Sequence, residues 1–415
     1  EPDNTLSARL CEELKLSGYV AFSISDLHVL QMAVQERIPV AVIINTCFLE
    51  NNGVNKILDI QRELVNPFHV FCILSNGDLL PRLLAVRTGS DAFFQKPLDF
   101  DYLMQSLNLK FSQASGEPYR ILIIDDSHSI ANYYTLILNQ AGMTAKALTN
   151  PLEIFNEMES FQPTLILMDV YMPQCNGFEL SGVLRQESSY AQIPIIFLST
   201  EDDKEKKLFA LSLGGDDFLT KPVSPQHLIS TVRSRSKRAS MLNYYITTDS
   251  LTGLLNHSSI LKQLEIQISR AKKTNSHGSF IMVDLDYFKR INDSYGHPMG
   301  DVVIKRLAQL FLSNLRNQSS VGRYGGEEFA LILPGESLQK SSVIASNLST
   351  QFSEFVFKAN HLEFHATFSA GVSYFDGGSR ASVVIEQADK ALYNAKHMGR
   401  NQVTIFKEQV YQGIR

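Results

Sequence analysis

An internal repeat is the feature that most constrains how the first half of this chain folds. Five features recur in the same order at an offset of 124 or 125 residues. They are Gly18-Tyr19 and Gly142-Met143, Asn45 and Asp169, Gly53 and Gly177, Ser75 and Ser199, and Lys96-Pro97 and Lys221-Pro222. A unit of about 120 residues has the usual size of one domain. The repeat therefore predicts two copies of one domain, one after the other.

The second copy has the sequence pattern of a parallel α/β sheet. Four short apolar runs alternate with stretches of helical pattern: ILII (121–124), LILM (165–168), PIIFLS (194–199) and DFLT (217–220). Strands that alternate with helices predict a parallel sheet covered on both faces. The carboxyl ends of such strands form the edge where ligands bind.

Five polar side chains fall at this predicted edge. Asp125 and Asp126 follow the first strand, Asp169 follows a later one, and Ser199 and Lys221 end the last two. Crowded carboxylates raise one another's pKa, and a divalent cation such as Mg²⁺ relieves that repulsion. Any one of these residues alone is more simply explained as a strand cap or a surface group. Because five such residues occur in this order at the ends of predicted strands, we favour a cation-binding site over separate structural roles.

The second copy resembles the receiver domain of bacterial response regulators. The motifs that carry the resemblance are IIDD (123–126), MDVYMP (168–173), LS (198–199) and TKP (220–222), and it extends over residues 118–238. It implies a flavodoxin-like fold, with a five-stranded parallel sheet and helices on both faces. It also implies that Asp169 accepts a phosphoryl group from a histidine kinase or a phosphotransfer protein. The roles it implies for the other residues are Mg²⁺ binding at Asp125 and Asp126 together with Asp169, a switch pair formed by Ser199 and Phe218, and a contact from Lys221 to the phosphorylated aspartate.

The first copy departs from this pattern. Asn45 stands where the second copy has Asp169, and NTCFLE replaces DVYMPQ. An amide cannot form the acyl phosphate that a carboxylate nucleophile forms. We therefore predict that residues 1–110 are a degenerate receiver domain. We expect its first strand, with any acid pair, to lie before residue 1.

The stretch between the second copy and the rest of the chain predicts one long helix. Residues 225–249 contain no glycine and no internal proline. The basic run RSRSKR (233–238) is more simply a solvated helical face than a nucleic-acid contact. Net charge is −5, the four cysteines have no metal-ligand spacing, and we find no signal peptide or membrane-spanning stretch. We expect a cytoplasmic protein without a nucleic-acid partner or membrane insertion.

The segment RYGGEEFALIL (323–333) places two glycines before two acids. Two glycines between strand-like runs predict a tight hairpin in which both take positive φ. The run SFIMVD (279–284) predicts a neighbouring strand ending in Asp284, which would meet Glu327 and form a Mg²⁺ site. Residues 286–301 read as a turn-rich stretch before a helix over 302–315.

Residues 243–415 resemble the GGDEF domain of diguanylate cyclases. The resemblance is carried by DSLTGLLN (249–256), VDLDYFKRIND (283–293), GHPMGD (296–301), RYGGEEF (323–329), FSAGVSYF (368–375) and ADKALYNAKHMGRN (388–401). Together the three domains resemble the PleD-type arrangement of receiver, receiver and GGDEF. This implies condensation of two GTP into cyclic di-GMP and two pyrophosphates.

The resemblance also implies roles for individual residues. Mg²⁺ binds Asp284, the Leu285 carbonyl and Glu327, while Asn292 and Asp301 read guanine. Lys289, Lys396 and Arg400 contact phosphates, with the last two on one helical face. Glu327, Glu328 and Lys289 form the catalytic group.

Each GGDEF domain binds one GTP, so the reaction implies a homodimer, which we expect to form through the receiver domains and the linker helix. Many such cyclases have an RxxD product-binding motif before the hairpin. Here Arg316 remains but Ser319 replaces the acid, which predicts weak or absent product inhibition.

Two other functions fit parts of the sequence. The third domain could sense GTP or cyclic di-GMP without turnover, although no signature acid is lost. The receivers alone could act as a signalling scaffold. Turnover of GTP distinguishes the enzyme from both.

Overall fold

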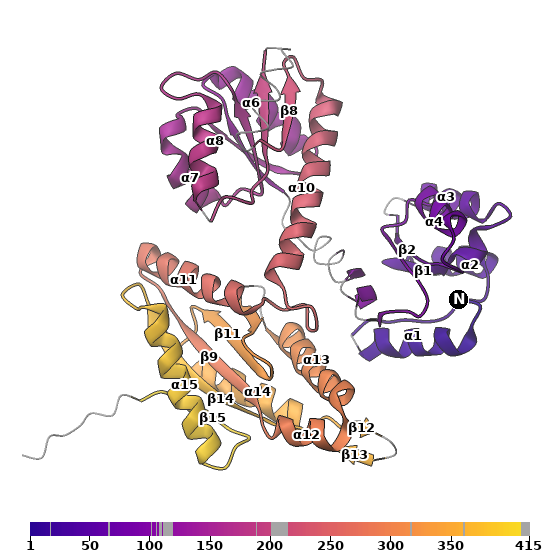
Figure 1. Cartoon of the computed structure of the whole chain (residues 1–415), viewed down its shortest axis with the longest axis vertical. Helices are drawn as coiled ribbons and strands as arrows, with labels where there is room; N and C mark the ends of the chain where they lie inside the picture. Colours follow the sequence, from indigo (N-terminus) through magenta and orange to yellow (C-terminus); the bar gives the residue numbers. More distant parts are fainter. Residues whose placement is uncertain are drawn as a thin grey trace, which may run out of the picture. The chain divides into compact units, whose positions relative to one another are not determined.

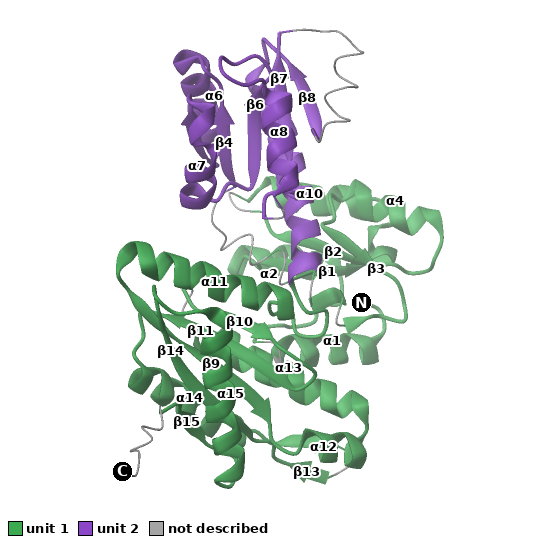
Figure 2. Ribbon diagram, turned by 60° about the vertical axis from the view of Figure 1, so that its left-hand side comes forward, with its two compact units in different colours: residues 1–110, 248–415 green, residues 111–247 purple. Residues whose placement is uncertain are grey.

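The chain is described by a computed structural model that covers residues 1–16, 18–64, 67–100, 102–104, 106–107, 110, 119–187, 189–200, 215–315, 318–359 and 362–407. It divides into two compact units, residues 111–247 and residues 1–110 with 248–415 (Figure 2). We refer to residues 1–110 as the N-terminal segment, 119–247 as the central unit and 248–407 as the C-terminal segment. The 111–118 linker and Arg316 lie outside the described residues.

The central unit is a five-stranded parallel sheet in the order β5-β4-β6-β7-β8. Helices α6, α7, α8 and α10 lie around it (Figure 1). Its strands are β4 (Arg120–Ile124), β5 (Thr144–Leu148), β6 (Leu165–Asp169), β7 (Ile195–Ser199) and β8 (Asp217–Thr220). Its helices are α6 (His128–Gln140), α7 (Ile154–Phe161), α8 (Gly177–Gln186) and α10 (Pro225–Thr247), with a short 3₁₀ turn, η2 (Pro151–Glu153). The predicted flavodoxin-like fold is confirmed here.

The apolar strands of the central unit are buried on both faces. Ile121 and Ile123 of β4 pack with α6 and α10, whereas Leu122 and Ile124 pack with α7 and α8. Alternate residues of a strand face opposite sides of a sheet, so each short run contributes to two cores. The strand order reverses between β4 and β6, and the carboxyl ends at such a switch point form a crevice.

The N-terminal segment has a smaller sheet than predicted. Its described strands β1 (Ala41–Asn45), β2 (His69–Ile73) and β3 (Ala92–Phe94) are parallel and ordered β1-β2-β3. Its helices are α1 (Asn4–Leu16), α2 (Leu27–Glu36), η1 (Thr46–Leu49), α3 (Gly53–Arg62) and α4 (Leu79–Arg87).

The reason for the smaller sheet is the position of the repeat in the sequence. By the offset of 124, residues 20–24 correspond to β5, but they form no strand, and Val20 is exposed. In the central unit β5 pairs only with β4, and residues equivalent to β4 are not part of this sequence. We expected a five-stranded sheet in the central unit and the same sheet without its first strand in this segment. The described residues of this segment form three strands.

The C-terminal segment is a mixed sheet in the order β10-β11-β9-β14-β15, antiparallel except for the last pair. These strands are β9 (His277–Leu285), β10 (Ser320–Arg323), β11 (Glu328–Pro334), β14 (Phe368–Asp376) and β15 (Val403–Ile405), and β12 (Phe357–Ala359) pairs separately with β13 (Leu362–Phe364). The helices are α11 (His257–Thr274), α12 (Phe288–Tyr295), α13 (His297–Asn314), α14 (Leu338–Ser353) and α15 (Ala381–His397).

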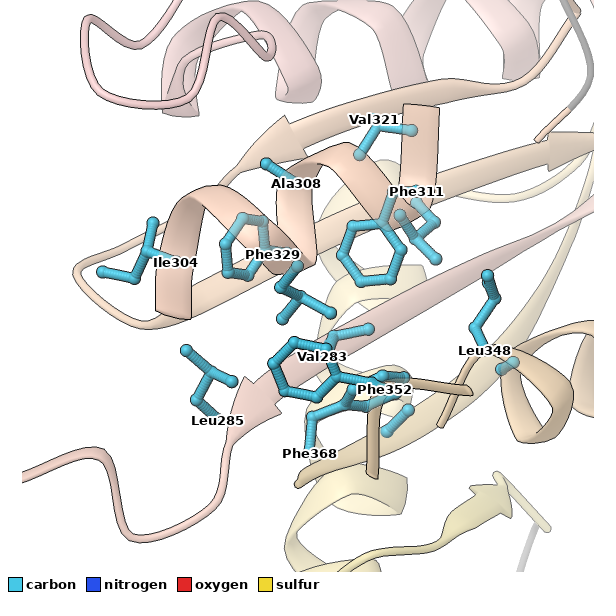
Figure 3. Close-up of a cluster of buried hydrophobic side chains, with 14 of the residues drawn as sticks. Val283, Leu285, Ile304, Ala308, Phe311, Val321, Phe329, Leu348, Phe352 and Phe368 are labelled. Carbon is cyan, nitrogen blue, oxygen red and sulfur yellow. The ribbon is translucent and has the colours of Figure 1, made fainter. Parts of the chain in front are cut away.

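Aromatic side chains fix the central strands of this sheet against two helices. Phe311 of α13 lies edge-on to Phe329 of β11 and to Phe368 of β14, and Phe352 of α14 packs on Phe368 (Figure 3). Helices α11 and α15 cover the other face through a second buried cluster. The ends of β9 and β11 are thus held rigidly, which matters because acidic residues stand there.

Residues 286–301 were predicted to be turn-rich, and this was wrong. They contain α12 and the first turn of α13. Asn, Asp, Ser and Gly in this stretch are turn formers, but Phe288 and Ile291 are three residues apart and both are buried. Burial of that face outweighs the local turn preference.

The hairpin between β10 and β11 is confirmed, with a different loop from the one predicted. Neither Gly325 nor Gly326 has a φ in the left-handed region. The Tyr324 and Gly325 N–H groups both donate to the Glu328 carbonyl, so the loop is longer than a two-residue turn. An added Cβ at Gly325 would lie 2.6 Å from Glu328 Oε2, so a larger residue there would displace the Glu328 carboxylate.

The predicted linker helix is one continuous element, α10, of 23 residues. Part of its basic run bonds to the central unit. Arg235 Nε lies 2.9 Å from Asp217 Oδ2, and Arg233 donates to the Ala141 carbonyl. These contacts give the run a structural role within the protein.

Candidate functional site

Three aspartates meet at the switch point of the central unit. Asp125 follows β4 and Asp169 ends β6, and both are buried, whereas Asp126 is exposed. Carboxylate oxygens of the three lie within 4.8 Å of one another. The sequence prediction that these side chains converge agrees with this geometry.

Lys221 completes this cluster from the end of β8. Its Nζ donates to Asp125 Oδ2 at 2.7 Å and to Asp169 Oδ1 at 2.9 Å. Burial raises the pKa of Asp169, and the Lys221 ammonium offsets this only in part. Three carboxylates and one ammonium leave an excess of negative charge, which fits an oxygen-ligated divalent cation such as Mg²⁺.

The predicted switch residues flank the same edge. Ser199 ends β7 and is buried, and its carbonyl accepts the Lys221 N–H. Phe218 is the second residue of β8 and packs partly buried against the core. Ser199 therefore lies on the strand next to β6, and Phe218 lies on β8, one strand further out.

The N-terminal segment contains a neutral version of this cluster. Asn45 ends β1, and its Nδ2 donates to Glu1 Oε2 at 3.0 Å, while Lys96 Nζ donates to Glu1 Oε1 at 2.7 Å. By the offset of 124, Glu1 takes the place of Asp125 and Pro2 that of Asp126. This position therefore holds one acid and one proline, and the expectation that the first strand lies before residue 1 stays a prediction. One carboxylate balanced by one ammonium leaves no excess charge for a cation.

A second acidic cluster stands at the end of β9 in the C-terminal segment. Asp284 and Leu285 are its last residues, and the strand register places Glu328 of β11 directly opposite Asp284. Directly opposed residues on neighbouring strands point to the same face. The structure thus pairs Asp284 with Glu328, whereas Glu327 lies one residue earlier, opposite Leu285, whose N–H donates to its carbonyl.

Four carboxyl groups share this region with one lysine. Lys396 of α15 lies 2.8 Å from Asp284 Oδ2. Burial raises the pKa of Asp284, Glu327, Glu328 and Asp389, and the Asp284 charge raises the pKa of both glutamates further. Such crowding is unfavourable for the protein alone and suits a site completed by Mg²⁺.

A pocket of 450 Å³ opens beside these acids. It is lined by residues from α12, α13 and the hairpin: Phe288, Lys289, Asn292, Asp293, His297, Asp301, Ile304, Arg323, Gly326 and Glu327. Four residues predicted from the sequence, Lys289, Asn292, Asp301 and Glu327, are among them. Lys289 and Asn292 line it from α12, whose existence the sequence prediction missed, Asp301 from α13 and Glu327 from the hairpin.

Asn292 is held against the backbone of the next helix. A Cβ at Gly300 would collide with its Oδ1 atom, so glycine is required there. Within the described part of the chain this buried Oδ1 atom has no hydrogen-bond donor. The same atom packs against Gly300, and Asn292 as a residue lines the pocket.

Arg400 lies near the cluster but not on the predicted helical face. Helix α15 ends at His397, and Gly399 and Arg400 both have positive φ. The spacing of four residues between Lys396 and Arg400 predicted that both lie on one face of a helix. This was wrong, because the helix ends before Gly399, which lies between the two residues.

Two site residues were missed by the sequence analysis. Arg323 Nη1 lies 3.2 Å from each carboxylate oxygen of Asp249, and Arg323 Nη2 donates to the Gly326 carbonyl at 2.7 Å. Asp249 follows the last residue of α10 by two positions. Asp249 is the first residue of the motif DSLTGLLN, and Arg323 is the first residue of RYGGEEF. The sequence contains no spacing pattern that would predict contact between these two residues.

Comparison with known proteins agrees with this geometry. Residues 246–402 match the diguanylate cyclase GGDEF-domain family, and residues 121–233 match the response regulator receiver-domain family. The chain is 30% identical to the response regulator PleD of Caulobacter vibrioides over 362 residues, which cover 78% of this chain and 79% of PleD. The chain belongs to the response regulators with a GGDEF diguanylate cyclase domain.

Other relatives match over smaller parts of their length. The probable diguanylate cyclase DgcE of Escherichia coli is 34% identical over 44% of this chain and 17% of DgcE. An uncharacterized 76.5 kDa protein of Thiocystis violacea is 30% identical over 78% of this chain, which spans 48% of that relative. The solved GGDEF domain of DgcB from Caulobacter crescentus, in complex with c-di-GMP, aligns with 38% of this chain and 95% of that one, at 32% identity and a TM-score of 0.38.

As a response regulator with diguanylate cyclase output, the chain has a receiver domain in its central unit and a GGDEF domain in its C-terminal segment. None of the helices in the described residues combines the length and hydropathy needed to cross a bilayer.

The crowded acids of the GGDEF domain predict a pH-dependent stability. Because burial raises the pKa of Glu328 in the folded state, the folded domain holds more protons than the unfolded chain above the ordinary carboxyl pKa of about 4. Stability from this group is therefore lost as pH rises through the raised pKa. As the pH rises from 4.5 to 7.5 in EDTA, we expect the melting temperature of Glu328→Gln to fall by less than that of the wild type. Melting temperatures measured with EDTA and with Mg²⁺ check this, since Mg²⁺ should reduce the difference. An identical pH profile for both proteins contradicts it.

Proposed function

We propose that the chain is a phosphorylation-controlled diguanylate cyclase that condenses two GTP into one cyclic di-GMP and two pyrophosphates. The observation that carries this proposal is the pairing of Glu328 with Asp284 beside the pocket lined by Lys289, Asn292 and Asp301. This arrangement joins carboxylates that suit Mg²⁺ to groups that suit a purine base and its phosphates.

Guanine binds in the pocket between α12 and α13. The Asp301 carboxylate accepts from the ring N–H and the exocyclic amino group of guanine, a donor pair that adenine does not offer. The Asn292 amide, oriented by its packing on Gly300, contacts the same base. Lys289, Lys396 and Arg400 surround the triphosphate with positive charge.

We assign Mg²⁺ to Asp284, the Leu285 carbonyl and the two glutamates, with Glu328 opposite Asp284 as the principal partner. When bound, Mg²⁺ neutralises charge on the reacting phosphate and lowers the pKa of the attacking hydroxyl. Glu327 lines the pocket, and its raised pKa suits it to accept that proton. The sequence alone favoured Glu327 for the metal and Glu328 for the proton. We exchange their main roles because Glu328 stands opposite Asp284 in the strand register.

The reaction joins two nucleotides. The 3′-hydroxyl of each GTP attacks the α-phosphorus of the other, the bond from that phosphorus to the β-phosphate oxygen breaks, and pyrophosphate leaves. Holding the two nucleotides in line accounts for much of such catalysis. Because each GGDEF domain holds one GTP, two chains must face each other.

The C-terminal turns of α10 support pairing of two chains. Leu242 is 55% exposed and Met241 beside it 38%, and exposed apolar residues continue at Tyr245 and Ile246. Apolar residues on successive turns of a helix favour packing against another helix. We assign the homodimer to α10 and the receiver domains.

Control is assigned to Asp169, phosphorylated by a histidine kinase or a phosphotransfer protein in the cytoplasm, where GTP is available. We divide the chain into a degenerate receiver (1–110), a phosphoacceptor receiver (118–238) and the GGDEF domain (243–415). The repeat, the shared strands β1–β3 and the Glu1–Asn45–Lys96 cluster support the first of these.

Weak product inhibition remains a prediction. Ser319 precedes β10, where an acid would orient Arg316, and Arg316 lies outside the described residues.

Incubating the purified chain with GTP and Mg²⁺ tests the proposed reaction. We expect cyclic di-GMP and pyrophosphate in a ratio of one to two. Binding of GTP without product would favour the sensing module and would overturn the enzyme.

A further inference from the structure

Tyr287 has a backbone conformation that its side chain disfavours. It lies between β9 and α12 with φ 57° and ψ 28°. The left-handed region is rare for residues other than glycine and asparagine, and a bulky residue there is a genuine outlier. Such residues persist where the surrounding structure holds them, and they cluster at functional sites.

The residue before Tyr287 anchors this turn. Asp286 is buried, and its carboxylate accepts from Thr367 Oγ1 at 2.8 Å, Ser369 Oγ at 2.7 Å and the Asn401 N–H at 2.9 Å. The last of these bonds joins the Tyr287 turn to the turn after α15. Arg400, the residue before Asn401, also has a positive φ of 66°.

The anchored turns bring Tyr287 and Arg400 into contact. Arg400 Cζ lies 4.5 Å from the centroid of the Tyr287 ring, and Arg400 Nη1 lies 3.3 Å from the Tyr287 hydroxyl. The Arg290 guanidinium lies over the same ring at 4.7 Å. A guanidinium over an aromatic face is attracted by the ring quadrupole, so the ring holds two cations close together that would otherwise repel.

Among the described residues, neither core packing nor helix capping accounts for a tyrosine at this position. The ring is 49% exposed, so it contributes little to the core, and it makes no capping bond to α12. Glycine would fit the backbone better. The side chain therefore has a use that outweighs the backbone strain.

We propose that Tyr287 is a positioning residue that holds Arg400 ready for the triphosphate of GTP. This inference rests on the proposed role of Arg400 as a phosphate contact. Stacking and the hydroxyl contact restrict a long, flexible side chain before the nucleotide arrives, which reduces the entropy lost on binding.

The test uses the full chain and four variants. Tyr287→Gly removes the ring and relieves the backbone, whereas Tyr287→Phe keeps the ring and removes only the hydroxyl. Asn275→Gly is the matched control, because Asn275 has φ 51° at the end of α11, away from the pocket. Arg400→Ala completes a double-mutant cycle with Tyr287→Gly.

We expect Tyr287→Gly to raise KM for GTP, and the Kd for a non-hydrolysable GTP analogue, about three- to tenfold, with little change in kcat and no fall in melting temperature. Tyr287→Phe should stay within about twofold of wild type, and Asn275→Gly should leave both constants unchanged. In the Arg400→Ala background, Tyr287→Gly should have no further effect.

Two results separate the possible failures. The positioning role is overturned if Tyr287→Gly weakens GTP binding by the same factor in the wild-type and Arg400→Ala backgrounds. It is also overturned if Tyr287→Gly has no effect on GTP binding while Arg400→Ala weakens it. In both cases the phosphate-binding role of Arg400 stands. If Arg400→Ala itself leaves KM and Kd unchanged, the proposed phosphate contact fails and the inference fails with it.

Discussion

Replacing Glu328 by glutamine is expected to lower the kcat for cyclic di-GMP formation about a thousandfold. Glu328 lies opposite Asp284, and the pair supplies the negative charge for Mg²⁺ at the end of β9. Loss of about 4 kcal/mol of transition-state stabilisation corresponds to that factor. Asp284→Asn should have an effect of the same size. Initial rates of pyrophosphate release measure both.

The fold should survive these substitutions. Removing the Glu328 carboxylate relieves repulsion among the crowded acids, so the melting temperature of Glu328→Gln without Mg²⁺ should not fall. Glu386→Gln is the matched control, since this glutamate is exposed on α15 and pairs only with Lys390 among the contacts described. It should retain wild-type activity. A Glu328→Gln variant with more than a tenth of wild-type activity would show that the metal assignment is wrong.

The second large effect is expected at Asp169. Asp169→Asn should reduce phosphoryl incorporation from acetyl phosphate at least a hundredfold, to background, because an amide cannot form the acyl phosphate. The variant should also lose any change in cyclase rate that beryllofluoride produces in wild type. Intact-protein mass spectrometry and cyclase assays measure the two effects.

Asn45→Asp provides the sharpest control for this result. It restores an aspartate in the first copy, but Pro2 occupies the second acid position and Lys96 already pairs with Glu1. We expect no phosphorylation at residue 45, even in the Asp169→Asn background. A phosphorylated Asp at that position would contradict the view that the first copy has lost its metal site.

The parts of the fold that could be predicted from the sequence are those marked by an apolar run or by the internal repeat. The strands ILII, LILM and IIFL are buried on both faces, so their composition identifies them without knowledge of their neighbours. The residues at their ends could then be placed together, because parallel strands share a carboxyl edge.

The pairing of acids in the GGDEF domain could not be predicted in the same way. Glu327 and Glu328 are adjacent, and a shift of one residue in register changes which of them shares a face with Asp284. In the observed register Phe329 and Phe368 pack against Phe311, and these contacts are visible only in the folded chain. Similarly, burial of Phe288 and Ile291 created α12 despite its turn-forming residues.

The neutral cluster of Glu1, Asn45 and Lys96 has a consequence for signalling. On the proposed assignment, the Asp169 cluster would change its charge on binding Mg²⁺ or a phosphoryl group, whereas the Glu1 carboxylate is already bonded to Asn45 and Lys96. The central unit and the N-terminal segment would then respond differently to one stimulus, and the output domain could respond to that difference.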